Sequence, residues 1–129
     1  MASTKPVFQK LGLKPTHRAA KLRVPADAAK SLGAVPAGCR FEARLSGAFD
    51  FILAFYESQK EFDSELPKLK KSLAKSGMAW VCWRKGNVTD VSRDTIAAEV
   101  ASVGLETVSS CAIDDHWSAL KLMYPKDQR

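Results

Sequence analysis

The sequence predicts a small three-layer α/β fold, in which helices cover both faces of a mostly parallel sheet and the C-terminal strand is antiparallel. Two runs, Phe51–Tyr56 and Met78–Trp83, are continuously apolar, as in parallel strands that are buried on both faces. Amphipathic helical stretches alternate with the predicted strands, which is typical of crossover connections. Only a short turn at Asp114-Asp115 separates the last two predicted strands, so these must be antiparallel neighbours.

The first part of the chain carries the weaker signals. Its predicted elements are a mobile tail (Met1–Lys5), a helical turn (Pro6–Leu11) closed by Gly12, a strand (Arg18–Val24), a helix (Ala26–Leu32) and a second strand (Arg40–Leu45). Pro25 stops the first strand because it has no N–H to donate. Gly33 is placed to cap the helix at its C-terminal end. Apolar and charged residues alternate in the second strand, which predicts one exposed face.

The second part is more strongly patterned. Its predicted elements are the strand at Phe51–Tyr56, a helix (Ser58–Ala74), the strand at Met78–Trp83, a polar loop (Arg84–Asn87), a helix ending near Val103, two strands (Leu105–Ile113 and Trp117–Tyr124) and a polar tail (Lys126–Arg129). Pro67 interrupts the first helical pattern, which predicts a kink or two abutting helices. Gly77 is expected to cap that helix, and Thr89 or Asp90 to begin the next one. Gly104 then ends it.

Length and composition predict one globular domain over residues 1–129, with flexible tails at 1–5 and 126–129. The chain is 46% hydrophobic and 26% charged, which is enough apolar material for a core and excludes disordered classes. No apolar run approaches the roughly 18 residues that a membrane span needs. The first residues also lack the apolar segment of a secretory signal.

The cysteines favour a reducing compartment. Cys39, Cys82 and Cys111 are odd in number and widely spaced, whereas small secreted folds carry dense, even sets. We therefore expect a cytoplasmic protein. No C-x-x-C pair occurs and only His17 and His116 could add imidazole, so the sequence predicts no metal site.

The positive charge is unevenly distributed. The formal net charge is +6, and residues 1–46 carry nine Lys or Arg against only Asp27 and Glu42, so all of the excess lies in the first third. Such asymmetry is compatible with nucleic acid, anionic lipid or an acidic partner, and equally with a solvated surface. No aromatic RNA-binding strand, basic heptad helix or zinc-finger spacing accompanies it.

The second half of the chain resembles a known fold. Phe49–Tyr124 is similar to the C-terminal half of a Rossmann-like methyltransferase, in which strand, helix, strand, helix and a closing antiparallel hairpin follow in this order. Phe49-Asp50-Phe51-Ile52 resembles the strand after the acceptor region. Leu69–Trp83 resembles the helix, glycine turn and strand that follow it.

The whole chain also resembles a family of small bacterial proteins catalogued as domain of unknown function 3052. The matching segments are Lys10–Pro15, Phe49–Phe51, Leu66–Lys70, Trp80–Trp83, Thr89-Asp90 and Cys111–Leu120. This resemblance implies a fold and no particular activity.

The chain departs from methyltransferases where these bind S-adenosylmethionine. They place a glycine-rich turn after the first strand, and here that segment, Val24–Ala29, has no glycine. Pro25 removes a donor, and the β-carbons of the alanines fill space. The second strand ends Arg44-Leu45-Ser46, without the acidic residue that would hold the ribose, and at least one strand–helix unit is missing. We therefore expect no binding of the cofactor in the usual manner.

A ligand site is expected at the carboxyl ends of the parallel strands, where open α/β sheets collect their ligands. Four segments should converge there: Pro25–Ala28, Tyr56–Gln59, Trp83–Asp90 and the start of the last strand at Asp114–Ser118. The candidate ligand-binding residues are Trp83, Arg84, Lys85, Thr89, Asp90 and Trp117. They combine aromatic faces, two cations and a helix start, which together suit a small anion. The same residues are also explained by ordinary helix capping and side-chain packing.

No catalytic constellation is evident. Asp114–Ser118 unites carboxylates, an imidazole and a hydroxyl, but a β-turn that leads into a strand explains the same residues. Nucleophilic catalysis needs groups brought together from different elements. His17 is expected at the surface. One of Trp80, Trp83 and Trp117 should line a groove or a subunit contact, since each indole N–H needs a partner.

Three functions remain open, in this order. The first is a non-catalytic module that binds a small anionic ligand or a protein partner. The second is a divergent S-adenosylmethionine-dependent transferase, and the third is a nucleic-acid binder that uses residues 1–46. A homodimer formed through an edge strand or an exposed tryptophan is also compatible with the sequence.

Overall fold

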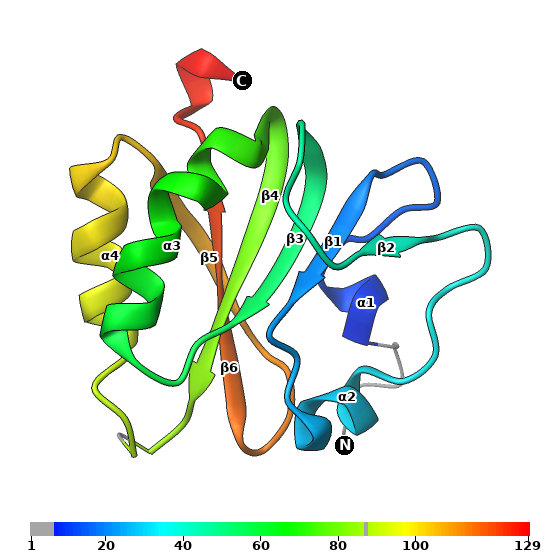
Figure 1. Ribbon diagram of the computed structural model, residues 1–129, viewed down its shortest axis with the longest axis horizontal. Coiled ribbons are helices and arrows are strands. Elements are labelled where there is room, and N and C mark those ends of the chain that lie inside the picture. Colours follow the sequence, from blue (N-terminus) through cyan, green and yellow to red (C-terminus); the bar gives the residue numbers. More distant parts are fainter. Residues whose placement is uncertain (1–6, 87) are drawn as a thin grey trace.

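A computed structural model describes residues 7–86 and 88–129 and shows one six-stranded sheet (Figure 1). The strands are β1 (Ala19–Leu22), β2 (Phe41–Glu42), β3 (Phe49–Phe55), β4 (Leu73–Arg84), β5 (Glu106–Ala112) and β6 (Trp117–Met123). Their order across the sheet is β2-β1-β3-β4-β6-β5. The first four strands are parallel, β6 runs antiparallel to β4, and β5 runs antiparallel to β6. The predicted mostly parallel sheet with an antiparallel C-terminal strand is confirmed.

Two helical layers enclose this sheet. The helices are α1 (Val7–Lys10), α2 (Ala26–Leu32), α3 (Gln59–Ser72) and α4 (Arg93–Ser102), and Lys126–Gln128 forms a short 3-10 helix. The side chains of α3 and α4 pack on one face of the sheet, and those of α1 and α2 pack on the other (Figure 1). The three-layer arrangement follows from the alternation of strands and helices along the chain.

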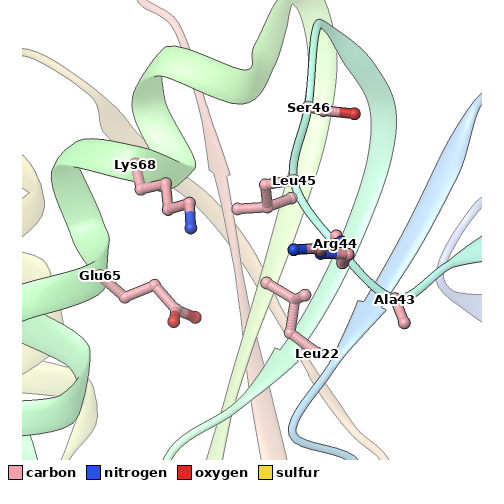
Figure 2. Close-up of a pocket in the computed structure, with 7 residues that line it drawn as sticks. All are labelled: Leu22, Ala43, Arg44, Leu45, Ser46, Glu65 and Lys68. Carbon is pink, nitrogen blue, oxygen red and sulfur yellow. The ribbon is translucent and has the colours of Figure 1, made fainter.

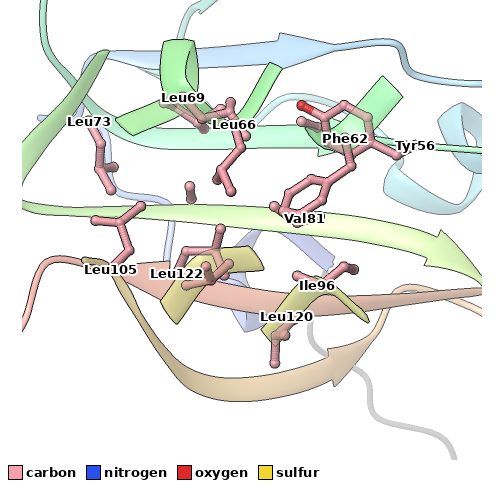
Figure 3. Close-up of a cluster of buried hydrophobic side chains, with 14 of the residues drawn as sticks. Tyr56, Phe62, Leu66, Leu69, Leu73, Val81, Ile96, Leu105, Leu120 and Leu122 are labelled. Atoms are coloured by element: carbon pink, nitrogen blue, oxygen red, sulfur yellow. The ribbon is translucent and has the colours of Figure 1, made fainter. Parts of the chain in front are cut away.

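Each face of the sheet has its own apolar core. Figure 3 shows the larger core, where Phe62, Leu66 and Leu69 of α3 and Ile96 of α4 meet Val81 of β4. The second core, on the side of α1 and α2, contains Phe8, Leu11, Ala28, Leu32, Phe51, Leu53, Phe55, Trp80 and Trp117. Every residue of the apolar run in β3 is buried, with consecutive residues alternating between the two cores, as expected for a strand covered on both sides.

The glycine and proline signals in the first part of the chain predict its helices well. The helix over Ala26–Leu32 has the predicted bounds, and Gly33 follows it at a φ of 73°. Gly12 closes α1 at a φ of 91°. The two strands are shorter than expected: β1 ends before Arg23, whose φ of 59° breaks the extended conformation, and β2 is reduced to two residues. The predicted tail at Met1–Lys5 lies outside the described residues.

Two expectations about the helix after β3 are corrected. Of the two alternatives at Pro67, two abutting helices are excluded, because the chain forms a single helix through this proline. Pro67 and Asp63, whose carbonyl loses its helical donor, are both exposed, so water can replace the missing hydrogen bond. The helix ends at Ser72 rather than Ala74, because β4 already begins at Leu73.

Gly77 is therefore not a helix cap. It lies within β4, where the pairing with β3 shifts between Phe49 and Phe51. A β-carbon built on Gly77 would lie 2.7 Å from the carbonyl oxygen of Phe49 and 3.1 Å from that of Asp50. Glycine is required at this position because the backbone of β3 approaches closely.

In the part of the chain that the structure describes, no helix has the length and apolar character needed to traverse a bilayer. The same residues contain no cluster of three or more His, Cys, Asp or Glu side chains that could hold a metal ion.

Candidate functional site

Residues from all four predicted segments meet at the carboxyl ends of β1, β3 and β4. Arg84, at the end of β4, donates a hydrogen bond through Nε to Glu57 Oε1 (3.0 Å) and through Nη1 to Asp27 Oδ2 (3.2 Å). The indole Nε1 of Trp117 donates to the same Asp27 oxygen at 3.1 Å. The Arg84 guanidinium also stacks 4.3 Å above the centre of the Trp117 ring. We call Asp27, Glu57, Arg84 and Trp117 the edge cluster.

The charges of the edge cluster compensate one another. The hydrogen bond from Trp117 is the main reason why the pKa of Asp27 lies below its usual value, and Arg84 lowers it further. The hydrogen bond to Glu57 raises the pKa of Arg84. Arg84 was a candidate anion ligand, but two carboxylates of this chain already occupy its guanidinium.

The turn after β1 is filled by proline and alanine and has no glycine, as its sequence predicts. Pro25 precedes α2 at a φ of −72°, and its carbonyl accepts from the amide of Ala29 at 2.9 Å. The β-carbon of Ala28 is completely buried against the second core. This turn therefore lacks the glycines that let a ligand approach the backbone closely.

The strand alternation separates the candidate residues of β4. Trp83 and Lys85 lie on the opposite side of the sheet from Arg84, because successive residues of a strand point to opposite faces. They line a hollow of about 320 Å³ with Arg93 of α4 and with residues from the β5–β6 hairpin. The hairpin residues are Ser110, Cys111, Ala112 and Ser118. We call this space the Trp83 hollow.

Thr89 and Asp90 do not begin α4. The N-cap of α4 is Ser92, whose hydroxyl accepts from the amide of Thr95 at 3.2 Å, while Thr95 Oγ1 accepts from the amide of Ser92 at 2.9 Å. This is a reciprocal capping box, so the earlier residues are not needed as caps. Thr89 Oγ1 instead accepts from the amide of Val91 at 3.3 Å.

Asp90 accepts a hydrogen bond from the start of α3 rather than capping α4, the helix for which it was predicted. Its Oδ1 accepts at 2.9 Å from the amide of Gln59, the first residue of α3. A carboxylate is favourable there, because the first turn of a helix presents unpaired N–H groups and a positive dipole end. The anion at the start of α3 is thus one of the chain's own side chains. Asn87, in the same loop, lies outside the described residues.

The three tryptophans differ in their environment. Trp117 is fully buried beneath Arg84, so its face is not available to a ligand. Trp80 is 3% exposed, and its Nε1 donates to the carbonyl of Leu11 at 2.8 Å. Trp83 is half-buried and lines the hollow that bears its name.

Asp114–Ser118 forms a turn that one carboxylate organises. Asp114 Oδ1 accepts from the amides of His116 (2.7 Å) and Trp117 (2.9 Å), and its Oδ2 accepts from the Ser31 hydroxyl at 2.5 Å. Residues 113–116 form a bend that leads into β6 at Trp117. His17 is half-buried, and its Nδ1 accepts from the amide of Lys14 at 3.2 Å.

Sequence reasoning missed several residues of the site. Arg93 and Ser110 reach the Trp83 hollow from α4 and β5, and no local pattern marks them; Ser118 of β6 ends a predicted segment but was not among the candidate residues. The capping box did leave a signal, because Ser92 and Thr95 have the spacing that such boxes need.

Two adjoining hollows lie beside α3, and Figure 2 shows the first of them. The first, of about 440 Å³, is lined by Leu22, Ala43, Arg44, Leu45, Ser46, Glu65 and Lys68. The second, of about 290 Å³, shares Leu45, Ser46 and Lys68 and adds Gly47, Lys71 and Ser72. We call the pair the α3 groove. A further shallow hollow, of about 500 Å³, lies over Lys21 and Phe41 near the opposite edge of the sheet from β5.

The sheet order and the two helical layers define a Rossmann-like α/β fold of the methyltransferase type. No protein-family model matches the sequence. No curated protein is similar to it in sequence either.

Solved structures nevertheless resemble it. A ribosomal protein L11 methylase from Lactobacillus delbrueckii superposes with a TM-score of 0.59 at 15% identity, over 92% of this chain and 74% of that one. A putative methyltransferase from Thermoplasma acidophilum gives 0.61 at 9% identity, over 98% and 77%. The magnesium protoporphyrin IX methyltransferase of Synechocystis with bound SAM gives 0.61 at 11% identity, over 92% and 74%. The chain thus has a methyltransferase-like fold, and at these identities the likeness shows the fold alone.

Proposed function

We propose that this chain is a non-catalytic binding module that holds a small planar anion in the Trp83 hollow. The observation that carries this proposal is the pairing state of Lys85 and Arg93, which both line the hollow. Within residues 7–86 and 88–129, neither cation forms an ion pair with a carboxylate. The Trp83 ring and the hydroxyls of Ser110 and Ser118 add an aromatic surface and hydrogen-bonding groups.

The ion pairs of the edge cluster support a non-catalytic role. Arg84 is the cation at the carboxyl edge, and it is paired with both Asp27 and Glu57. The preceding turn offers Pro25 and the buried Ala28 where a nucleotide-binding turn needs glycine. A ligand at this edge would have to displace the chain's own ion pairs.

The competing proposal is a divergent S-adenosylmethionine-dependent transferase, and the resemblance to methyltransferase structures favours it. This function would require the ion pairs of Arg84 with Asp27 and Glu57 to break. A nucleic-acid function receives less support, because Arg18 and Arg23, two of the basic residues in the first third, are paired with Glu42, Glu61 and Glu65.

Two further proposals concern the whole chain. Membership of the family of domain of unknown function 3052 is supported by the matching segments, among them Trp80–Trp83 and Cys111–Leu120. A cytoplasmic location is supported by the free state of Cys39, Cys82 and Cys111.

Tryptophan fluorescence tests the binding proposal, with nicotinate as the probe because it is a planar aromatic carboxylate. We expect saturable quenching in wild type and at least a tenfold loss of affinity in the Lys85→Gln/Arg93→Gln double variant, about 1.4 kcal/mol or more. Lys60→Gln/Lys126→Gln is the matched control, because it removes the same charge from residues that line neither the Trp83 hollow nor the α3 groove.

Two results would reject the proposal. One is equal quenching in both double variants, which would show that the hollow is not the binding site. The other is a thermal stabilisation by S-adenosylmethionine that Arg84→Gln abolishes, which would establish the transferase alternative. Native mass spectrometry of the protein purified from its own host would then identify the co-purifying molecule.

A further inference from the structure

The α3 groove exists because the connection from β2 to β3 contains no helix. Parallel strands are usually joined by a helix that packs on the sheet. Here residues 43–48 cross back without regular secondary structure and leave a space between themselves and α3. Figure 2 shows this segment on one side of the space and the α3 residues Glu65 and Lys68 on the other, with Leu22 between them.

The groove has an excess of unpaired positive charge. Arg44 lines it from the connecting segment, and Lys68 and Lys71 line it from α3. In the described part of the chain, none of the three is ion-paired with a carboxylate. Among the described residues that line the groove, Glu65 is the one carboxylate, and it is already engaged by Arg23 (3.4 Å) and by the Tyr56 hydroxyl (2.5 Å).

A serine hydroxyl opens onto the same space. Ser72 is 5% exposed and lines the groove at the C-terminal end of α3. Its hydroxyl makes no hydrogen bond to another described residue and is therefore free to donate into the groove. The amides of residues 43–47 donate to no described protein group either. The groove therefore combines cations with unused hydrogen-bond donors.

We propose that the α3 groove binds a small phosphomonoester. A phosphate group carries two negative charges and three strong acceptor oxygens, which matches Arg44, Lys68 and Lys71 together with the Ser46 and Ser72 hydroxyls. Hollows of 440 and 290 Å³ suit the remainder of a sugar phosphate or a mononucleotide. Leu22 and Leu45 offer apolar surface to that remainder.

Electrostatics make this binding depend on the cations. The C-terminal end of a helix carries a partial negative charge, so the end of α3 by itself disfavours an anion. Lys68 and Lys71 must outweigh that field, and the affinity should fall steeply with ionic strength. The groove shares no lining residue with the Trp83 hollow, so this inference is independent of the function proposed above.

Amide NMR spectra of the full chain test the proposal, with inorganic phosphate, ribose 5-phosphate and AMP as probes. We expect shifts confined to residues 43–47 and 68–72, and tighter binding of at least one ester than of inorganic phosphate. Ribose 5-phosphate and AMP distinguish a sugar phosphate from a nucleotide. The Lys68→Gln/Lys71→Gln variant should bind at least tenfold more weakly, and Ser72→Ala several-fold more weakly.

The Lys60→Gln/Lys126→Gln variant serves again as the control and should bind like wild type. The proposal is overturned if neither ester binds more tightly than inorganic phosphate, or if the control loses as much affinity as Lys68→Gln/Lys71→Gln. Shifts centred on Trp83 and Ser118 would also overturn it, because they would place the ester in the other hollow.

Discussion

Gly77→Ala tests the close approach of β3 and β4 directly. The new β-carbon would lie 2.7 Å from the Phe49 carbonyl oxygen, 3.1 Å from that of Asp50 and 3.2 Å from that of Ala74. All three are backbone atoms, so no flexible side chain can move aside. Gly77 is also the one glycine of seven without a positive φ, which means that the substitution tests space and not conformation.

The expected magnitude follows from two opposing effects. Overpacking a tight site costs about 1–3 kcal/mol. Replacing glycine with alanine returns about 0.4–1 kcal/mol, because the unfolded chain loses freedom. We expect a net destabilisation of about 1–2 kcal/mol, or a fall in Tm of about 4–7 °C for a chain of this length.

Urea unfolding followed by circular dichroism and tryptophan fluorescence measures this change. Ser76→Ala is the matched control, since Ser76 is the exposed neighbour and its substitution should stay within about 0.5 kcal/mol of wild type. If Gly77→Ala proves as stable as Ser76→Ala, the packing of β4 against β3 described here is wrong.

Two further predictions concern a helix cap and a turn. Ser92→Ala should cost about 1 kcal/mol in urea unfolding because Ser92 caps α4, whereas Thr89→Ala should cost clearly less, and the reverse order would reinstate Thr89 as the cap. Burial raises the pKa of Asp114, but the hydrogen bonds from Ser31 and from two backbone amides outweigh this and hold the pKa below its usual value. Its stabilising effect should therefore be present above about pH 4 and be lost as the pH falls through the lowered value. Asp114→Asn should be less stable at pH 7 and lose less stability on acidification, and parallel pH profiles of the two proteins would refute this assignment.

The sheet could be predicted from the sequence where burial on both faces leaves a continuous signal. Phe51–Tyr56 is such a run, and it corresponds closely to the central strand β3. The helix Ala26–Leu32 was equally accessible, because Gly33 marks its end locally. The boundary at Ser72 was not, because β4 pairs with β3 in a shifted register that no short pattern reveals.

The convergence of the four segments could be predicted, but not the arrangement of the side chains within them. Topology alone brings Asp27, Glu57 and Arg84 to one edge, since the carboxyl ends of parallel strands coincide. Whether Arg84 is free or paired depends on side chains that are distant in sequence: Asp27 is separated from it by an entire helix and two strands. Arg93 and Ser118 reach the Trp83 hollow for the same nonlocal reason.

The alternation of β4 has a consequence for how this protein can change. Trp83 and Arg84 are adjacent in the chain, yet Trp83 lines a hollow with Arg93 of α4, whereas Arg84 is ion-paired with Asp27 of α2. The backbone of β4 thus separates the Trp83 hollow from the edge cluster, which differ in their chemistry. Mutations on one face of β4 can accumulate with little effect on the other face. An insertion of one residue in β4 would instead move each following side chain to the opposite face and disrupt both sites at once.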